Sequence, residues 1–243
     1  MSIKSFLIIF LILFSVKCGE ENALIKLLKS FLQNYVSNDT LIKFIEIIRG
    51  KEKHNFENHL SYNTQAFKNH LSAIRANKGF IEDQSNYKDM KYGLKTLNEN
   101  GCGLIATYNV IHFITGDTNI NFPAIIDYFE KDGILLSGYF GTSIVAISEY
   151  FKKNGYQVMK STKKAEYDNI GNNMKAFILM VYNDKDDITA AMHFMAITKS
   201  NGKYYVHNNG YKSSNVAYTS ISDVLAKINS GKAKDVMLIG MSK

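Results

Sequence analysis

Proline and tryptophan are almost absent from this sequence, and no internal repeat or low-complexity tract interrupts it. The 243 residues include a single proline, Pro123, and no tryptophan, whereas Tyr and Phe are abundant. An architecture of proline-shaped loops is therefore excluded, and the chain must consist mainly of regular elements. A hydrophobic content of 46% argues against disorder and is enough to bury one sizeable core.

A basic stripe is also lacking. The formal net charge is +7, but Lys is accompanied by Asp and Glu through most of the chain. This pattern allows a general attraction to acidic surfaces and does not indicate nucleic-acid binding. The acidic stretch 183–187 lacks the glycine and the closing glutamate of a calcium loop. We therefore expect no metal and no cofactor.

The N-terminus carries a short apolar run, too short to span a bilayer comfortably. Residues 1–18 combine Lys4, this apolar run and a polar exit, which is the layout of a secretory signal peptide. We expect a secreted or extracellular protein that has no stable membrane span after the leader is removed. The alternatives are a lipoprotein anchored through Cys18, which the preceding Lys17 disfavours, and an uncleaved apolar anchor.

Cysteine is scarce, and the leader makes it scarcer. The sequence has only Cys18 and Cys102, and both cleavage of a signal peptide and lipidation would set Cys18 aside. Because secreted proteins usually pair their cysteines, the lone thiol of Cys102 suggests a chemical role. The alternative is a small buried residue that packs under a helix.

Hydrophobic periodicity divides the remaining chain into two parts. Residues 19–89 predict amphipathic helices followed from residue 77 by a polar linker, and form a helical extension that is either a pro-segment or a structural lobe. Residues 90–243 predict an α+β domain, because three helices precede an antiparallel sheet. Its helices are expected at 103–114, 122–131 and within 141–155, its β-rich runs at 156–160, 175–183, 190–199, 203–209 and 234–242, and a short helix at 220–228.

Cys102 stands between two glycines, directly before the first of these helices, in the stretch "NGCGLIATYNVI". Free N–H groups and the positive end of the helix dipole lower the pKa of a thiol at such a position, so we expect a reactive thiolate. The N–H of Cys102 is also available to bind an oxyanion.

A nucleophilic cysteine needs a base, for which His193 is the candidate. His193 begins the alternating run "HFMAITK", and Asn208 follows the next strand, where its amide is expected to accept the imidazole N–H and fix the tautomer. Asn209 is the alternative to Asn208. His112 is excluded as the base, because about three helical turns, at roughly 1.5 Å per residue, separate it from Cys102.

With Cys102, His193 and Asn208 in this order, residues 90–243 resemble the papain-like cysteine peptidases, especially the branch that cleaves double-glycine leaders from bacteriocins. The stretches "NGCGLIATYNVI", "MHFMAI" and "YYVHNN" carry the resemblance. It implies a papain-like fold and a thiol-dependent hydrolase with a Cys-His-Asn triad and a peptide or protein substrate. The alternatives are an acyl or peptidyl transferase that uses the same triad, and a catalytically weak binding module.

The resemblance also directs attention to the oxyanion. Family members usually have an oxyanion-binding glutamine five or six residues before the cysteine, where this sequence has Leu97 and Thr96. We expect Asn98, or its neighbour Asn100, to supply this donor together with the N–H of Cys102.

Overall fold

The fold is described from a computed structural model of the chain. The residues described are 37–49, 56–184, 192–209 and 216–243. The leader, the first helix expected in the extension and residues 185–191 lie outside these ranges.

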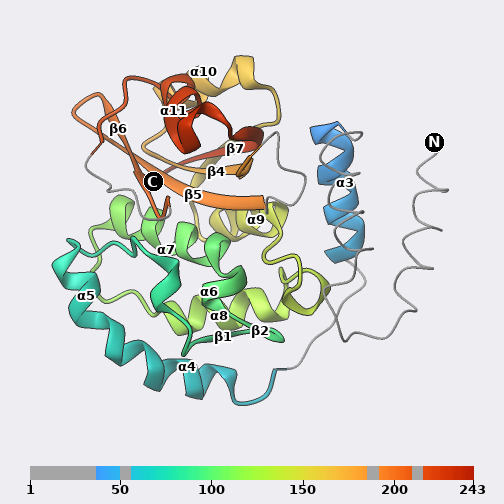
Figure 1. The fold of residues 1–243 in the computed structure, drawn as a ribbon, viewed down its shortest axis with the longest axis vertical. Helices are drawn as coiled ribbons and strands as arrows, with labels where there is room; N and C mark the ends of the chain where they lie inside the picture. Colours follow the sequence, from blue (N-terminus) through green and yellow to red (C-terminus); the bar gives the residue numbers. More distant parts are fainter. Residues whose placement is uncertain (1–36, 50–55, 185–191, 210–215) are drawn as a thin grey trace.

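A five-stranded sheet lies between two groups of helices (Figure 1). Its strands are in the order β3-β7-β4-β5-β6. All neighbouring strands are antiparallel. All seven residues of β4 are buried, as its continuous apolar sequence requires of an interior strand. The strands are β3 Gln157–Ser161, β4 Ala176–Tyr182, β5 Met192–Ser200, β6 Lys203–His207 and β7 Lys234–Ser242.

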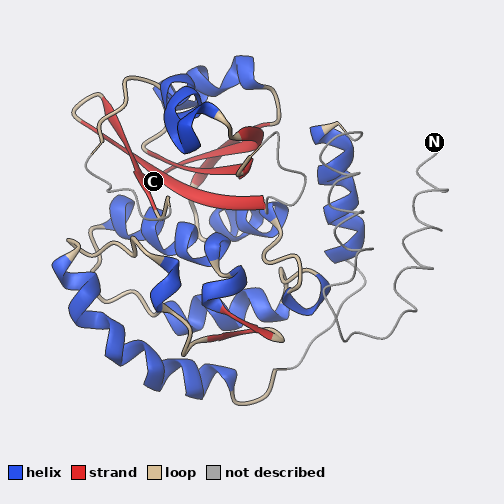
Figure 2. Cartoon of the chain, viewed as in Figure 1, coloured by secondary structure: helices blue, strands red, loops and turns tan. Residues whose placement is uncertain are grey.

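Helices cover both faces of this sheet (Figure 2). Three helices that precede the sheet in the sequence lie on one face: α7 Cys102–Thr115, α8 Phe122–Lys131 and α9 Ile144–Lys153. The short helices α10 Tyr167–Asn173 and α11 Ile221–Lys227 lie on the other. The predicted α+β class, with a cysteine at the start of a helix and an antiparallel sheet after it, is confirmed.

The alternation of side chains along the strands produces two hydrophobic clusters. Phe194 and Ala196 of β5 join the larger cluster, which contains the apolar residues of α7, α8 and α9. Met195 and Ile197 join the smaller cluster under α10 and α11. Because successive strand residues point to opposite faces, one apolar run stabilises both layers.

The helices begin and end at the capping residues that the sequence indicates. Helix α7 ends at Gly116, which has a left-handed φ of 67°. Asn121 caps α8 by accepting from the N–H of Ala124, and Pro123 lies in the first turn. Ser143 caps α9 in the same way. The sequence pattern does not predict α10, the four-residue helix α6 Leu97–Asn100, or the small hairpin of β1 Lys91–Tyr92 and β2 Lys95–Thr96.

The N-terminal part of the chain contributes α3 Asn38–Arg49, α4 His59–Phe67 and α5 Leu71–Ala76. Asn63 of α4 is fully buried and exchanges two hydrogen bonds of 2.9 and 2.8 Å with the main chain of Lys91. Phe67 packs its ring against Tyr108 and Phe122. Helix α4 is therefore attached to β1 by polar contacts and to the α7–α8 layer by apolar contacts.

Residues 77–93, expected to be a polar linker, are also packed against this layer. Ile81, Tyr87 and Met90 are buried in the larger cluster. These three apolar side chains are spaced too irregularly to produce a helical or strand period, which explains why the pattern was missed. None of the helices in the described ranges is long and apolar enough to cross a bilayer.

Candidate active site

The glycines on either side of Cys102, Gly101 and Gly103, lie in close contact with neighbouring parts of the chain. A Cβ on Gly103 would lie 2.9 Å from the Thr142 side chain, and one on Gly101 would lie 2.7 Å from the carbonyl oxygen of Leu97. Both distances are too short for a real side chain. The glycines therefore permit α6 to turn directly into α7, with Cys102 as the first residue of α7.

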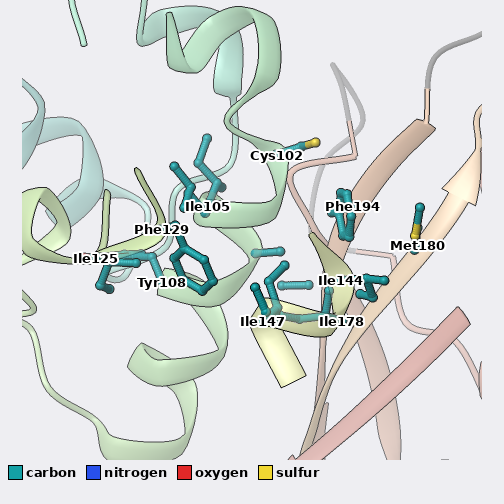
Figure 3. Close-up of a cluster of buried hydrophobic side chains, with 14 of the residues drawn as sticks. Cys102, Ile105, Tyr108, Ile125, Phe129, Ile144, Ile147, Ile178, Met180 and Phe194 are labelled. Carbon is teal, nitrogen blue, oxygen red and sulfur yellow. The ribbon is translucent and has the colours of Figure 1, made fainter. Parts of the chain in front are cut away.

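Cys102 is 8% exposed and lies at the edge of the larger cluster. Figure 3 shows its sulfur directed away from Ile105 and Tyr108, which belong to the same helix. Burial raises the pKa of the Cys102 thiol to about 11, although the N–H groups of Phe194, Gly103 and Cys102 itself oppose this rise. The predicted lowering of the thiol pKa is therefore wrong for the resting site, because desolvation outweighs the helix terminus.

Cys102 lines a cavity of about 280 Å³ between the start of α7 and the ends of the sheet strands. His193, Asn208 and Asn98, the other residues predicted for the site, line the same cavity. Gln84, which no sequence motif indicates, is a further lining residue.

His193 is half-buried and donates from Nε2 to the main-chain carbonyl oxygen of Asn208 at 2.7 Å. Because a carbonyl can only accept, the imidazole hydrogen must be on Nε2, and Nδ1 is the basic nitrogen. Burial lowers the pKa of His193 below its ordinary value, an effect that the bond to Asn208 partly offsets. The imidazole is therefore neutral at pH 7.

The side chain of Asn208 makes a different contact from the one expected. Its Oδ1 accepts from the main-chain N–H of Gln84 at 3.0 Å, and its Nδ2 donates to Gln84 Oε1 at 3.3 Å. The tautomer of His193 is thus fixed by the main chain of Asn208, while the amide of Asn208 holds Gln84. Asn209 does not line the cavity.

Gln84 connects three parts of the site. Besides its contacts with Asn208, its Nε2 donates to the carbonyl oxygen of Asn98 at 2.9 Å. A primary amide has two hydrogens on nitrogen, and this bond uses one of them. Gln84 lies eighteen residues before Cys102, so a search at the usual spacing of five or six residues does not find it.

The two asparagines before Cys102 differ in environment. Asn98 reaches the cavity from α6, whose first turn is fixed by a reciprocal capping box of Thr96 and Glu99. Asn100 is buried and donates to the main-chain carbonyl of Gly138 instead. Of the two, only Asn98 is placed at the cavity.

Helix α7 also holds the segment that carries Gln84. The amide of Asn109 exchanges hydrogen bonds of 2.8 and 2.9 Å with the N–H and the carbonyl of Ile81. Nε2 of His112 lies 2.9 Å from the carbonyl oxygen of Lys78. His112, excluded as the base by its distance along the helix, therefore has a structural contact outside the cavity.

Among the described residues, no group of three or more His, Cys, Asp or Glu side chains is arranged to hold a metal ion. The carboxylates of Asp83 and Glu99 and the hydroxyl of Ser85 line the cavity at Cys102. It is also lined by the imidazole of His193 and by four side-chain amides, those of Gln84, Asn98, Asn183 and Asn208. The imidazole and the amides are suited to moving one proton and to hydrogen-bonding an acyl oxygen.

The sequence matches no known protein family and no curated protein. Among solved structures it is similar to the peptidase domain of ComA from Streptococcus, a bi-functional ABC transporter involved in a quorum sensing pathway. The similarity covers 58% of this chain and 90% of that chain, at 16% identity and a TM-score of 0.36. These values are too low to assign the chain to a family.

Proposed function

We propose that this protein is a thiol-dependent hydrolase, most simply a cysteine peptidase, in which Cys102 is the nucleophile and His193 the general base. The observation that supports this best is the bond from His193 Nε2 to the Asn208 carbonyl. It leaves Nδ1 as the basic nitrogen of an imidazole that shares a cavity with the Cys102 thiol.

In the proposed reaction, Sγ of Cys102 attacks the carbonyl carbon of a peptide bond while Nδ1 of His193 takes the thiol proton. His193 then returns this proton to the leaving amine, and the acyl group stays on sulfur as a thioester. Water, deprotonated by His193, releases the acid and restores the thiol. Since the pKa of Cys102 is raised and that of His193 lowered, the proton moves during the attack rather than before substrate binds.

The oxyanion of the tetrahedral intermediate needs donors. We assign this role to the N–H of Cys102 and to the second Nε2 hydrogen of Gln84, with Asn98 holding Gln84 through its carbonyl. The side chain of Asn98, expected from the sequence to bind the oxyanion, lines the same cavity and is the competing donor.

Substrate and location rest on the sequence. A peptide or protein is the proposed substrate, and the leader at residues 1–18 leads us to propose secretion, with anchoring through a lipidated Cys18 as the alternative.

The test uses p-nitrophenyl acetate, a generic acyl donor, and follows nitrophenolate release together with the mass of the Cys102-containing peptide. We expect acetylation of Cys102 in the wild type, none in Cys102→Ser, and a rate at least about 100-fold lower in His193→Ala, as for loss of a general base. His70→Ala, which changes a histidine outside the cavity, is the matched control and is expected to match the wild type.

Equal acetylation rates in the wild type and His193→Ala would refute a catalytic pair and favour the binding-module alternative. An added amine that captures the acetyl group in preference to water would indicate a transferase rather than a hydrolase.

A further inference from the structure

A second carboxylate and a second histidine lie directly behind Asn208. Glu82 Oε1 is 2.7 Å from Nδ1 of His207, and Glu82 Oε2 accepts from the main-chain N–H of Asn208 at 3.3 Å. The other ring nitrogen of His207 lies 2.9 Å from the hydroxyl of Thr198. Phe80 stacks on the imidazole of His207, with 4.0 Å between ring centroids.

Thr198, His207 and Glu82 have the composition of a hydrolytic triad, but they cannot act as one. The Thr198 residue is 3% exposed and His207 is 5% exposed. Neither residue lines the cavity at Cys102. A substrate carbonyl therefore does not reach the Thr198 hydroxyl from this cavity. Glu82 and His207 can influence the reaction only through the residues that they contact.

Asn208 connects Glu82 to the site, because it contacts both Glu82 and His193. Its φ is 58°, a left-handed conformation that few non-glycine residues adopt and that Asn tolerates better than most. In this conformation its carbonyl accepts from His193 while its N–H is bound by Glu82. The contacts from Glu82 and Gln84 thus hold the residue from one side and leave its carbonyl for His193.

We propose that Glu82 is a positioning residue for the reaction proposed above, on which this inference rests. By binding the N–H of Asn208 and the imidazole of the adjacent His207, Glu82 keeps Asn208 left-handed. The Asn208 carbonyl then holds the hydrogen of His193 on Nε2, and Nδ1 remains the basic nitrogen of the imidazole. Glu82 does not line the cavity and touches no substrate.

A double-mutant cycle with iodoacetamide tests this role, because alkylation of Cys102 needs no knowledge of the natural substrate. Its four proteins are the wild type, Glu82→Ala, His193→Ala and the double variant. We expect Glu82→Ala to slow alkylation about tenfold when His193 is present, by analogy with the loss of outer partners of metal-bound histidines. In the His193→Ala background the same substitution should leave the rate unchanged.

Two further variants separate positioning from folding. Glu82→Gln keeps an oxygen for the N–H of Asn208 and is expected to restore most of the rate. Asp89→Ala removes a comparable partner, 2.7 Å from His70, away from the cavity, and is expected to alkylate like the wild type. Nitrogen-15 NMR of His193 should show the Nε2–H tautomer in the wild type and a mixture of tautomers in Glu82→Ala.

Equal slowing by Glu82→Ala in both backgrounds, or no slowing with an unchanged tautomer, would overturn the proposal. A wild type that reacts no faster than His193→Ala would refute the proposed function instead. In that case the tautomer of His193 in Glu82→Ala still decides whether Glu82 positions the imidazole.

Discussion

Asn109→Ala tests how the segment that carries Gln84 is attached to α7. The side chain of Asn109 is completely buried, and its amide satisfies both the N–H and the carbonyl of Ile81. Ile81 is itself 1% exposed, so water cannot replace these bonds. Leaving two buried main-chain groups without partners costs about 1–3 kcal/mol each, or about 2–6 kcal/mol in total. A typical domain has only about 5–15 kcal/mol of stability.

The fold offers a matched control. Asn63→Ala removes the same pair of hydrogen bonds from the main chain of Lys91, with similar distances and equal burial of the amide. Since Lys91 is exposed, water can reach its main chain, and we expect a loss near the lower end of this range. Asn63 is joined to the hairpin, whereas Asn109 is joined to the segment that carries Glu82 and Gln84.

Urea unfolding followed by circular dichroism measures both free energies of unfolding, and iodoacetamide measures the reactivity of Cys102 in the native state. We expect both variants to be destabilised but only Asn109→Ala to lose the part of the alkylation rate that depends on His193. A loss of less than about 1 kcal/mol in Asn109→Ala would refute the argument from unsatisfied groups. Unchanged reactivity in that variant would show that the segment does not need to be attached to α7.

Four further predictions concern the site. Because the pKa of His193 is lowered, its contribution to the alkylation rate should persist as the pH falls through 6.5 and disappear only at lower pH, where Nδ1 is protonated; an acid limb above 6.5 would contradict this. Toward pH 11 the rates of the wild type and His193→Ala should converge, because hydroxide then ionises the thiol directly. Gln84→Ala should slow acetylation by p-nitrophenyl acetate about 100-fold but change alkylation little, since alkylation creates no oxyanion; equal effects on both reactions would assign Gln84 a structural role instead. Removal of residues 19–89 should abolish acetylation by p-nitrophenyl acetate, because it removes Glu82 and Gln84 with the extension, whereas a pro-segment would give increased activity when removed.

The sequence predicts the regular elements of the domain well and the details of the site less well. Helix α8 and the strands β4 and β7 coincide closely with the expected runs. The cap residue Asn121 and Pro123 in the first turn indicate the helix, and short apolar runs bounded by polar residues indicate the two strands. Short elements such as α6 were missed because four residues carry too little periodicity to detect.

The candidate residues of the site were found by chain order, and their interactions required coordinates. Nothing in the sequence indicates that Asn208 contacts His193 through its main chain, since this depends on a left-handed φ. The raised pKa of Cys102 depends on burial by residues distant in sequence, which competes with the local effect of the helix terminus. Gln84 was missed because tertiary packing, rather than a fixed spacing, brings it to the cavity.

The position of β7 in the sheet has a consequence for synthesis of the chain. Strand β7 lies between β3 and β4, although both are made well before it. Until β7 emerges from the ribosome, one edge of β4 lacks its partner, and β4 presents an entirely apolar sequence. The nascent chain must therefore carry the unpaired edge of β4 while residues 183–233 are made, so folding of this protein is expected to depend on chaperones that shield β4 until β7 arrives.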